Sequence, residues 1–405
     1  MIHIFTITAR NYLSLAITLG DSVKKHHPEA RFSICVADGL DAIKTSDIEY
    51  ALVDVPAILG KTLTDDLAFK YNITEYCTSV KPILFRHFFE SEQDTDLIYY
   101  MDPDTFLYDR LDVITESTPE KTLYLAPHLL DCRIADDHPY PEYKHLWEGI
   151  FNLGFCAIRR TYKSAAIIDW WDTRLRQYCY ADHIDGLHTD QKWMDYAPAF
   201  FGLDLEIVRN YGVNVAHWNL GEREISSKED CIFANDDRLI FFHFSGFDFN
   251  GKVLAKHVSA EKQNYFSNTI KQMADTYRSS VHQNGYKKFI TIPYRYSSFD
   301  DGVAITSIHR RIYRTLSEKD GQKLPFEASS NFRKKIEKSR LLDFSKESLQ
   351  NYNSGTVQNL GKITRVLESS LKCFLLIFGI KNYSYLIKFF SRYSRIENNI
   401  FLLKD

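Results

Sequence analysis

Two aspartates follow a nearly all-apolar stretch in "LIYYMDPDTFLYDRL", residues 97–111. A strand alternates its side chains, so Asp102 and Asp104 share one face, while Pro103 points away and stiffens the turn. Two hard oxygen ligands on one side of a buried strand's carboxyl end suit a divalent cation that carries phosphates. The alternative is a loop whose carboxylates cap neighbouring backbone or face solvent.

The same spacing occurs just upstream, where Asp94 and Asp96 lie in the polar stretch "SEQDTD". No apolar strand precedes them, so we expect this pair to face solvent. Spacing alone therefore does not identify a metal site, and the surroundings must decide.

A second apolar stretch ends in chemically useful residues in "RLIFFHFSGFD", residues 238–248. His243 follows the strand, and an imidazole added to a carboxylate pair shifts the preference of a phosphate-bound metal from magnesium toward manganese. Gly246 would let the backbone approach a diphosphate closely. The alternative for His243 is a buried histidine that is bonded to backbone.

Two further motifs carry polar side chains at the ends of predicted elements. In "HTDQKWMDYAPAFF" (188–201), Thr189 is the expected N-cap of a helix over 189–200, which places Asp190 and Gln191 in the first turn, where the helix dipole favours a carboxylate. A simple helix-start signal is the alternative there.

In "FNLGFCAIRR" (151–160), a strand presents Asn152 and Gly154 on one face. An amide at that position can bond a substrate hydroxyl, and a purely structural buried amide is the alternative.

The elements that must position these residues begin at the N-terminus, with a buried strand over 2–8, a helix over 12–26 and a second strand over 31–38. A strand, a helix and a strand imply a right-handed parallel crossover, which predicts an α/β sandwich. The first strand is not followed by GxGxxG, so a dinucleotide fingerprint is not supported. We expect further strands over 97–101, 122–126, 151–158, 205–208 and 238–244, and helices over 74–90, 162–180 and 189–200.

Composition narrows the class of protein. The 405 residues are 44% hydrophobic and 14% aromatic, which is typical of a globular chain with a substantial core. A formal charge of −3 argues against a nucleic-acid binder. Seven scattered cysteines without a CxxC pair favour a reducing compartment, and we read neither a signal peptide nor 18 consecutive apolar residues. We therefore expect a cytoplasmic protein without a membrane-spanning helix.

We expect three regions along the chain: a catalytic domain over 1–282, a C-terminal extension over 283–350, and a linker with a basic tail over 351–405. Residues 361–405 carry eight basic and three acidic side chains, a net charge of +5, around the apolar stretch "CFLLIFGI". That composition is typical of a segment lying on an anionic membrane, here the inner face of the cell membrane. A helical hairpin packed on the catalytic domain or on a dimer partner is the alternative.

Taken in order, "YYMDPD", "NLGF", "TDQKW", "NVAHWNL" and "HFSGFD" resemble bacterial GT-A glycosyltransferases over residues 1 to about 280. The order is most similar to the retaining glycosyltransferase family 8, typified by glycogenin and the lipopolysaccharide galactosyltransferases. The resemblance implies a GT-A sandwich with a mixed, mostly parallel central sheet and a helical C-terminal extension. It also implies a hexosyltransferase that moves a sugar from a nucleotide-diphosphate sugar, a UDP-sugar above all, to a glycan or lipid-linked acceptor.

The resemblance implies roles for individual residues as well. Asp102, Asp104 and His243 would hold Mn²⁺, with Mg²⁺ as the alternative ion, and Asn152, Asp190 and Gln191 would line the reacting sugar. The remaining donor contacts would come from Thr6, Thr8, Ala9, Lys81, Gly154 and Gly246. Two features depart from the family pattern: Met101 replaces a small residue, and "GFDFNGK" replaces the usual Gly-x-x-Lys-Pro-Trp ending, which leaves Lys252 as a candidate phosphate contact.

Other functions compete with this interpretation. A sugar-phosphate nucleotidyltransferase would need a glycine-rich basic loop after the first strand, and "TITARNYLSLA" has neither glycine nor lysine. A metal-free glycoside hydrolase would use two carboxylates as acid and base, but two so close on one strand end suit one cation better. A non-catalytic protein that binds nucleotide sugars is the third alternative.

Overall fold

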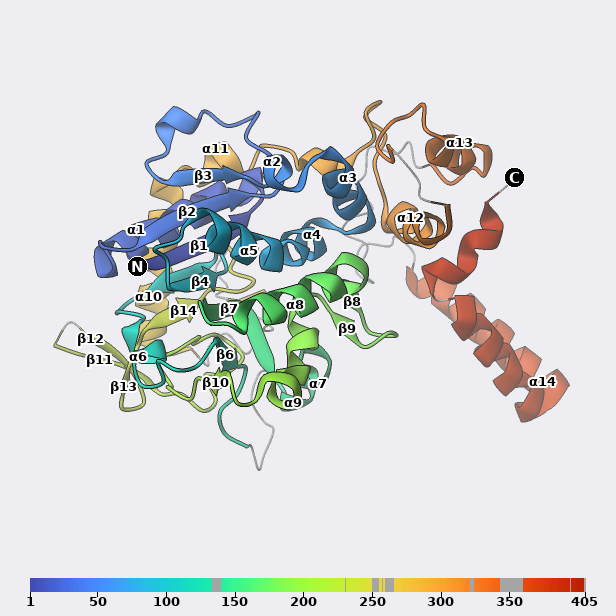
Figure 1. The fold of residues 1–405 in the computed structure, drawn as a ribbon. Coiled ribbons are helices and arrows are strands. Elements are labelled where there is room, and N and C mark those ends of the chain that lie inside the picture. Colours follow the sequence, from blue (N-terminus) through green and yellow to red (C-terminus); the bar gives the residue numbers. More distant parts are fainter. Residues whose placement is uncertain are drawn as a thin grey trace. The chain divides into compact units, whose positions relative to one another are not determined.

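The computed structural model describes residues 1–132, 140–229, 231–249, 255–256, 258, 266–320, 324–342, 360–393 and 395–403. The chain divides into two compact units, one formed by Met1–Lys61 with Ile73–Tyr294 and the other by Thr62–Asn72 with Arg295–Asp405. Figure 1 shows the elements of both units. Each unit has its own buried apolar core.

The first unit is built on a seven-stranded sheet in the order β10-β6-β7-β4-β1-β2-β3 (Figure 1). β7 runs antiparallel to both of its neighbours, and the other neighbouring strands are parallel, so the predicted mixed, mostly parallel sheet is confirmed. The strands are β1 (Ile2–Thr8), β2 (Arg31–Val36), β3 (Ala51–Asp54), β4 (Leu97–Met101), β6 (Leu123–Pro127), β7 (Phe151–Arg159) and β10 (Leu205–Ile207).

Helices cover both faces of this sheet, which explains why β1, β4 and β7 at its centre are buried over almost their whole length. Along β1, Ile4 belongs to a buried cluster with Leu19 of α1 (Leu13–His26), whereas Phe5 points the other way and meets Phe85 of α5 (Lys81–Ser91). The unit's other helices are α2 (Val55–Leu59), α4 (Ile73–Ser79), α6 (Asp112–Thr115), α7 (His145–Glu148), α8 (Ser164–Tyr178), α9 (Ala197–Phe201), α10 (Asn268–Gln283) and α11 (Tyr286–Phe289).

Short strands complete the unit outside the main sheet. β14 (Phe241–His243) pairs antiparallel with β5 (Thr105–Leu107), and this pairing ties the predicted 238–244 strand to the turn after β4. The remaining strands are β8 (Ala181–Asp182), β9 (Leu187–His188), β11 (Ile225–Lys228), β12 (Cys231–Ala234) and β13 (Asp237–Arg238).

Two predicted helices are divided in the structure. The helix expected over 74–90 is α4 followed by α5, and Pro82 lies in the first turn of α5, where its missing N–H costs nothing. The helix expected over 189–200 is a 3₁₀ helix, η4 (Gln191–Tyr196), followed by α9 with Pro198 in its first turn. The expected Thr189 cap is wrong: Asp190 is the residue before η4, and Thr189 has a φ of 47° and donates its hydroxyl proton to Asp190 Oδ1.

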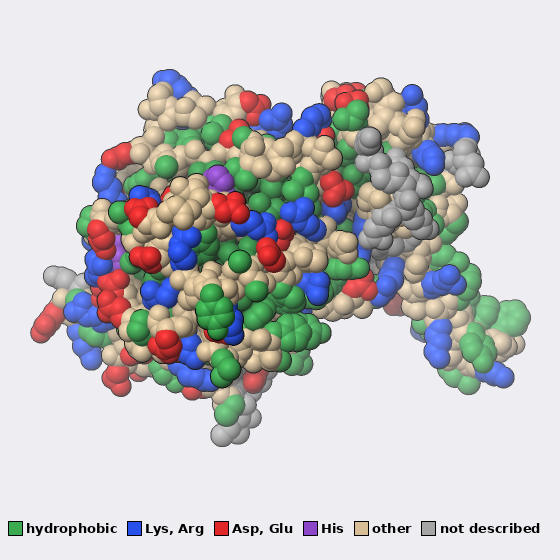
Figure 2. Space-filling model, viewed as in Figure 1, with side chains coloured by type: hydrophobic (Ala, Val, Ile, Leu, Met, Phe, Trp, Pro, Cys, Tyr) green, Lys and Arg blue, Asp and Glu red, His purple; other side chains and the backbone are tan. Residues whose placement is uncertain are grey.

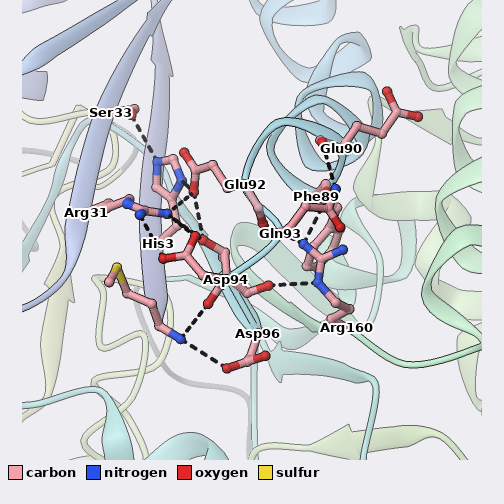
Figure 3. A network of polar contacts seen from close by, with 12 residues as sticks. His3, Arg31, Ser33, Phe89, Glu90, Glu92, Gln93, Asp94, Asp96 and Arg160 are labelled. Carbon is pink, nitrogen blue, oxygen red and sulfur yellow. Dashed lines mark hydrogen bonds and ion pairs between the residues drawn. The ribbon is translucent and has the colours of Figure 1, made fainter.

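The first Asp-x-Asp pair lies before β4 and takes part in a surface network (Figure 3). Asp94 accepts two hydrogen bonds of 2.9 Å from the Arg31 guanidinium, and Asp96 Oδ2 lies 3.0 Å from the N-terminal amine. Glu92 joins the same network through Arg31 and His3. These carboxylates already have cationic partners at the edge where β1 and β4 begin, as expected for a pair without a ligand role.

In the second unit, Arg310 of α12 (Ser307–Asp320) connects distant parts of the chain. Its buried guanidinium donates hydrogen bonds to the carbonyls of Ala68, Phe69 and Tyr71 and to that of Tyr296. Because buried carbonyls without donors are costly, this one side chain fixes the end of α3 (Lys61–Lys70) within the unit. The unit also contains α13 (Asn331–Lys338) and the C-terminal helix α14 (Leu360–Tyr393).

The C-terminal helix α14 is interrupted at Gly379, which has a φ of 73°. Its large apolar side chains are exposed, for example Leu376 at 84% and Ile377 at 72%. Figure 2 shows such side chains next to lysines and arginines over α14. Against our expectation from apolar run length, Thr364–Tyr393 is long and apolar enough to cross a membrane by length and composition, and none of its most apolar window is buried.

Candidate active site

Asp102, Asp104 and His243 come together although they are distant in sequence. The carboxylates leave the carboxyl end of β4, and the antiparallel pairing of β14 with β5 brings His243 opposite Thr105. His243 Nε2 lies 3.1 Å from Asp104 Oδ1 and 3.8 Å from Asp102 Oδ2, and one donor atom from each residue lies within 4.8 Å of the others. Two carboxylates and an imidazole form a donor set that suits Mn²⁺.

Gly154 of β7 lies beside two of these three donors, His243 and Asp102, and beside Asn152. A Cβ at this position would approach His243 Cε1 to 2.4 Å, Asn152 Oδ1 to 2.8 Å and Asp102 Oδ2 to 2.9 Å. The backbone carbonyl of Gly154 also accepts a hydrogen bond of 2.8 Å from the amide of Asp102. The glycine is therefore needed for close approach, because any side chain would displace the donor atoms.

Burial and neighbouring charges tune these donors. Burial raises the pKa of Asp102, although the charges of Lys81 and His243 act in the opposite direction. For His243, burial lowers the pKa, but the nearby Asp104 and Asp102 carboxylates outweigh it, and the net shift is upward. The Tyr100 hydroxyl donates to Asp102 Oδ1 and so stabilises the ionised carboxylate that a cation needs.

Asn152 lies at the start of β7 and is almost completely buried, as only 8% of it is exposed. Its Oδ1 accepts hydrogen bonds of 3.2 Å from the amide of Gly154 and from Asn214 Nδ2, and its Nδ2 donates to His128 Nε2 at 3.3 Å. The side chain is therefore fixed between His128 and the cluster of Asp102, Asp104 and His243, which we call the carboxylate group. A ligand would meet an oriented amide, which favours a positioning role.

Lys81 lies inside the protein, with 1% of its surface exposed. Its Nζ donates to the carbonyl of Leu153 at 2.8 Å and to Asp190 Oδ2 at 2.5 Å, and it lies 4.0 Å from the centroid of the Tyr100 ring. Burial lowers the pKa of Lys81, but the charges of Asp190 and Asp102 outweigh it. The net shift is upward, so the ammonium stays protonated. The predicted contact of Lys81 with a diphosphate stays a prediction.

Gln191 bridges two backbone segments beside this ion pair. Its Nε2 donates to the carbonyl of Glu148 at 2.7 Å, and its Oε1 accepts a weak bond of 3.4 Å from the amide of Leu153. Asp190 is 1% exposed and serves as the counter-ion of Lys81. The structure thus brings both residues to the start of β7, next to Asn152.

The end of β1 and the residue that follows it contribute buried groups at the same edge of the sheet. Thr6, Thr8 and Ala9 are all at most 3% exposed, and the Thr6 hydroxyl has no hydrogen-bond partner in the described part of the chain. Next to them, Asp38 accepts hydrogen bonds from the Arg10 amide at 2.9 Å and from Arg10 Nε at 3.1 Å.

Gly246 has a φ of 67°, a conformation that glycine adopts without strain, and it follows β14 as predicted. Lys252 lies outside the described residues.

Sequence reasoning missed several residues of this site. Asp38 follows the second strand in "ICVADG", where a carboxylate after a buried strand was the available signal. Asn214, with a φ of 53°, and Tyr100, which points from β4 toward Asp102, lie inside the motifs "NVAHWNL" and "YYMDPD", but sequence reasoning gave neither of them a role.

Comparison with known proteins gives distant similarities. No family model matches the chain. Two Bacillus subtilis (strain 168) proteins of uncharacterised function are similar: YfnF is 26% identical over 60% of this chain and 80% of its own length, and YfnD is 23% identical over 60% and 78%.

Several solved glycosyltransferase structures show a distant structural similarity to the chain. The galactosyltransferase LgtC, solved with donor and acceptor sugar analogues, is 16% identical over 72% of this chain and 97% of its own, with a TM-score of 0.40. Mouse xyloside xylosyltransferase 1 is 11% identical over 53% and 88%, with a TM-score of 0.36. The fold assignment therefore rests on the strand order itself, and membership of glycosyltransferase family 8 stays a prediction.

The crowding at Gly154 generates a testable prediction. Gly154→Ala should lower Mn²⁺ affinity by about 10-fold or more, because the added methyl group displaces His243 and Asp102, and should cost about 1–3 kcal/mol of stability through overpacking. Electron paramagnetic resonance of free Mn²⁺ measures the first effect, and urea unfolding measures the second.

Cys156→Ala is the control, because it removes atoms from the same strand and adds none toward the donors. Unchanged Mn²⁺ affinity in Gly154→Ala would contradict the assignment of Asp102, Asp104 and His243 as a metal site.

Proposed function

We propose that this protein is a metal-dependent glycosyltransferase that moves a sugar from a nucleotide-diphosphate sugar, above all a UDP-sugar, to a glycan or lipid-linked acceptor. The observation that carries the proposal is that Asp102, Asp104 and His243 bring one donor atom each within 4.8 Å of the others. Gly154, which has no side chain, leaves space next to His243 and Asp102. Such a group lies at the carboxyl ends of the parallel strands, where open α/β sheets bind ligands.

The residues present fit a cation that holds a diphosphate. His243 Nε2 faces the carboxylates of Asp102 and Asp104, and Gly154 leaves space beside His243 and Asp102. When bound, Mn²⁺ or Mg²⁺ would neutralise the charge that develops on the departing nucleoside diphosphate. Oxygen atoms of the diphosphate would fill the coordination positions that Asp102, Asp104 and His243 leave open.

The chain's own residues would perform the rest of the reaction. Asn152 would orient a sugar hydroxyl through its fixed amide. The base and ribose would be held by Asp38 and by Thr6, Thr8 and Ala9 at the end of β1. The ammonium of Lys81 places a buried positive charge near Asp102, which favours a negatively charged donor. Positioning and electrostatics of this kind supply most of the rate in group transfer from phosphates.

We further propose that the sugar is transferred with retention of its anomeric configuration. Gln191 lies beside Asn152 and the Lys81–Asp190 pair, and an amide is a poor nucleophile. Gln191 and Asp190 would therefore stabilise an oxocarbenium-like donor and would not form a durable covalent bond.

Removing one carboxylate tests the function. Asp102→Asn should lower Mn²⁺-dependent release of UDP from a UDP-sugar by about 100-fold or more, because the remaining donors hold the cation and diphosphate poorly. The measurement is a panel of nucleotide sugars with and without Mn²⁺, read by free UDP and by thermal shift.

The control is Asp94→Asn, which changes the same Asp-x-Asp spacing at the opposite edge of the sheet and weakens an exposed, solvent-screened ion pair with Arg31. Turnover of Asp102→Asn at the wild-type rate would refute the metal site. Donor binding without any UDP release would indicate a non-catalytic binding protein.

Stereochemistry gives a separate prediction. An α-linked donor should yield an α-linked product, because we propose that Gln191 and Asp190 stabilise the donor from the reacting face. Proton NMR of the product's anomeric signal measures this directly. A β-linked product would show inversion and would exclude the proposed arrangement of Gln191 and Asp190.

We also propose that residues 361–405 lie on the surface of an anionic membrane, which would place the site near a lipid-linked acceptor. The exposed apolar side chains of α14 and the net charge of +5 support this proposal. The interruption at Gly379 divides α14 into shorter segments, 360–378 and 380–393, which favours a segment lying in the interface over one that crosses the bilayer.

Flotation with liposomes tests the membrane proposal. The full chain should float with anionic vesicles at low salt and be released at high salt, because basic side chains supply about 1 kcal/mol each near the surface. A chain ending at Asn353 and neutral vesicles are the controls. A full chain that never floats would make the tail a packing element, and binding that resists high salt would indicate a spanning helix.

A further inference from the structure

A second group of ligand-type side chains lies near the carboxylate group and is unused by the proposed reaction. His128 follows β6, and His145 and Glu148 lie one helical turn apart at the two ends of α7. One donor atom from each of the three lies within 4.8 Å of the others. We call these three residues the histidine site.

His128 and Glu148 are held in the way that metal-ligating histidines and carboxylates usually are. His128 Nδ1 donates to the carbonyl of Gly149 at 2.9 Å, and the lone pair on Nε2 accepts a hydrogen bond of 3.3 Å from Asn152 Nδ2, which a bound ion would replace. Glu148 Oε1 accepts a hydrogen bond from the Tyr140 hydroxyl. Bonds of this type orient metal ligands and fix the histidine tautomer.

The third side chain, His145, has a polar partner at only one of its two ring nitrogens. Its side chain is only 9% exposed, its ring stacks on His128 with centroids 4.6 Å apart, and Nδ1 lies 3.1 Å from Glu148 Oε2. Nε2 makes no hydrogen bond in the described part of the chain. A buried ring nitrogen without a partner is costly unless something else satisfies it.

We propose that His128, His145 and Glu148 bind a second divalent transition-metal ion of the zinc class, in addition to any ion at the Asp102 group. Two imidazoles and one carboxylate are a donor set that zinc and cobalt accept, with one coordination position left open. The sequence signal is "HLWE", in which a histidine and a glutamate are three residues apart and share one face of a helical turn.

The histidine site is separate from the carboxylate group. The Trp218 ring lies between them, with its centroid 5.3 Å from that of His243 and 5.6 Å from that of His128. Asn152 contacts His128 directly, and Gln191 donates to the carbonyl of Glu148. An ion here would therefore brace α7 against the two residues proposed to face the sugar, as a positioning element.

Cobalt binding to the full chain, without an affinity tag, tests the proposal. Asp102→Asn with Asp104→Asn removes the carboxylate group, so that any tightly bound Co²⁺ reports on the histidine site. This variant should bind one equivalent of Co²⁺, seen by visible absorption, and Co²⁺ should raise its melting temperature by mass action. Adding Glu148→Gln or His145→Gln should weaken Co²⁺ binding by at least about 10-fold and remove the shift.

The matched control is His26→Gln on α1, which removes a histidine with an unpartnered Nε2 that belongs to neither group, and Co²⁺ binding should not change. Circular dichroism in the presence of a chelator checks that each variant is folded. The proposal fails if the carboxylate-free variant binds no Co²⁺. It also fails if Glu148→Gln and His145→Gln bind Co²⁺ as tightly as their parent. These measurements use no sugar donor, so their outcome is independent of glycosyl transfer.

Discussion

The arrangement of the candidate site depends on one buried ammonium. Lys81 begins α5, and its Nζ contacts the Leu153 carbonyl on β7, the Asp190 carboxylate before η4, and the Tyr100 ring on β4. Losing one partner of a buried ion pair typically costs about 3–5 kcal/mol, because the other charge stays in a medium of low dielectric. Three segments distant in sequence therefore meet at Lys81. Asn152 and Gln191 are held in place because they are adjacent in sequence to Leu153 and Asp190, which bind the ammonium.

The direction of β7 is the second constraint. Because β7 runs antiparallel to β4, its beginning lies at the sheet edge where β4 ends, and the Asp102 amide bonds to the Gly154 carbonyl. A parallel strand would bring its carboxyl end there instead, and its first residues would lie at the opposite edge. The reversal thus places Asn152 beside the carboxylates, and the resulting crowding allows only glycine at position 154.

Asn152 joins the polar chemistry on the two sides of Trp218. On one side, its Oδ1 lies close to where a Gly154 side chain would meet Asp102 and His243, and on the other side its Nδ2 bonds to His128. Buried polar networks of this kind are rigid when they are satisfied, because every member limits the rotamers of the next. Some atoms of this region lack a partner in the described part of the chain, among them His145 Nε2 and His243 Nδ1, and a cation bound at the histidine site would complete the network around His145.

The sequence by itself determined the strands, the order of the motifs and the residue types at strand ends, because apolar runs and the alternation of side chains are local properties. It could not distinguish Asp102 and Asp104 by spacing from Asp94 and Asp96, which the structure places at opposite ends of β4. Only the tertiary structure decided that Lys81 is buried against Asp190, that the 189–200 helix starts as a 3₁₀ turn, and that "HLWE" faces His128. The physical reason is that each of these facts depends on which strands pair and in which direction, and strand pairing joins residues too far apart for any local pattern to record.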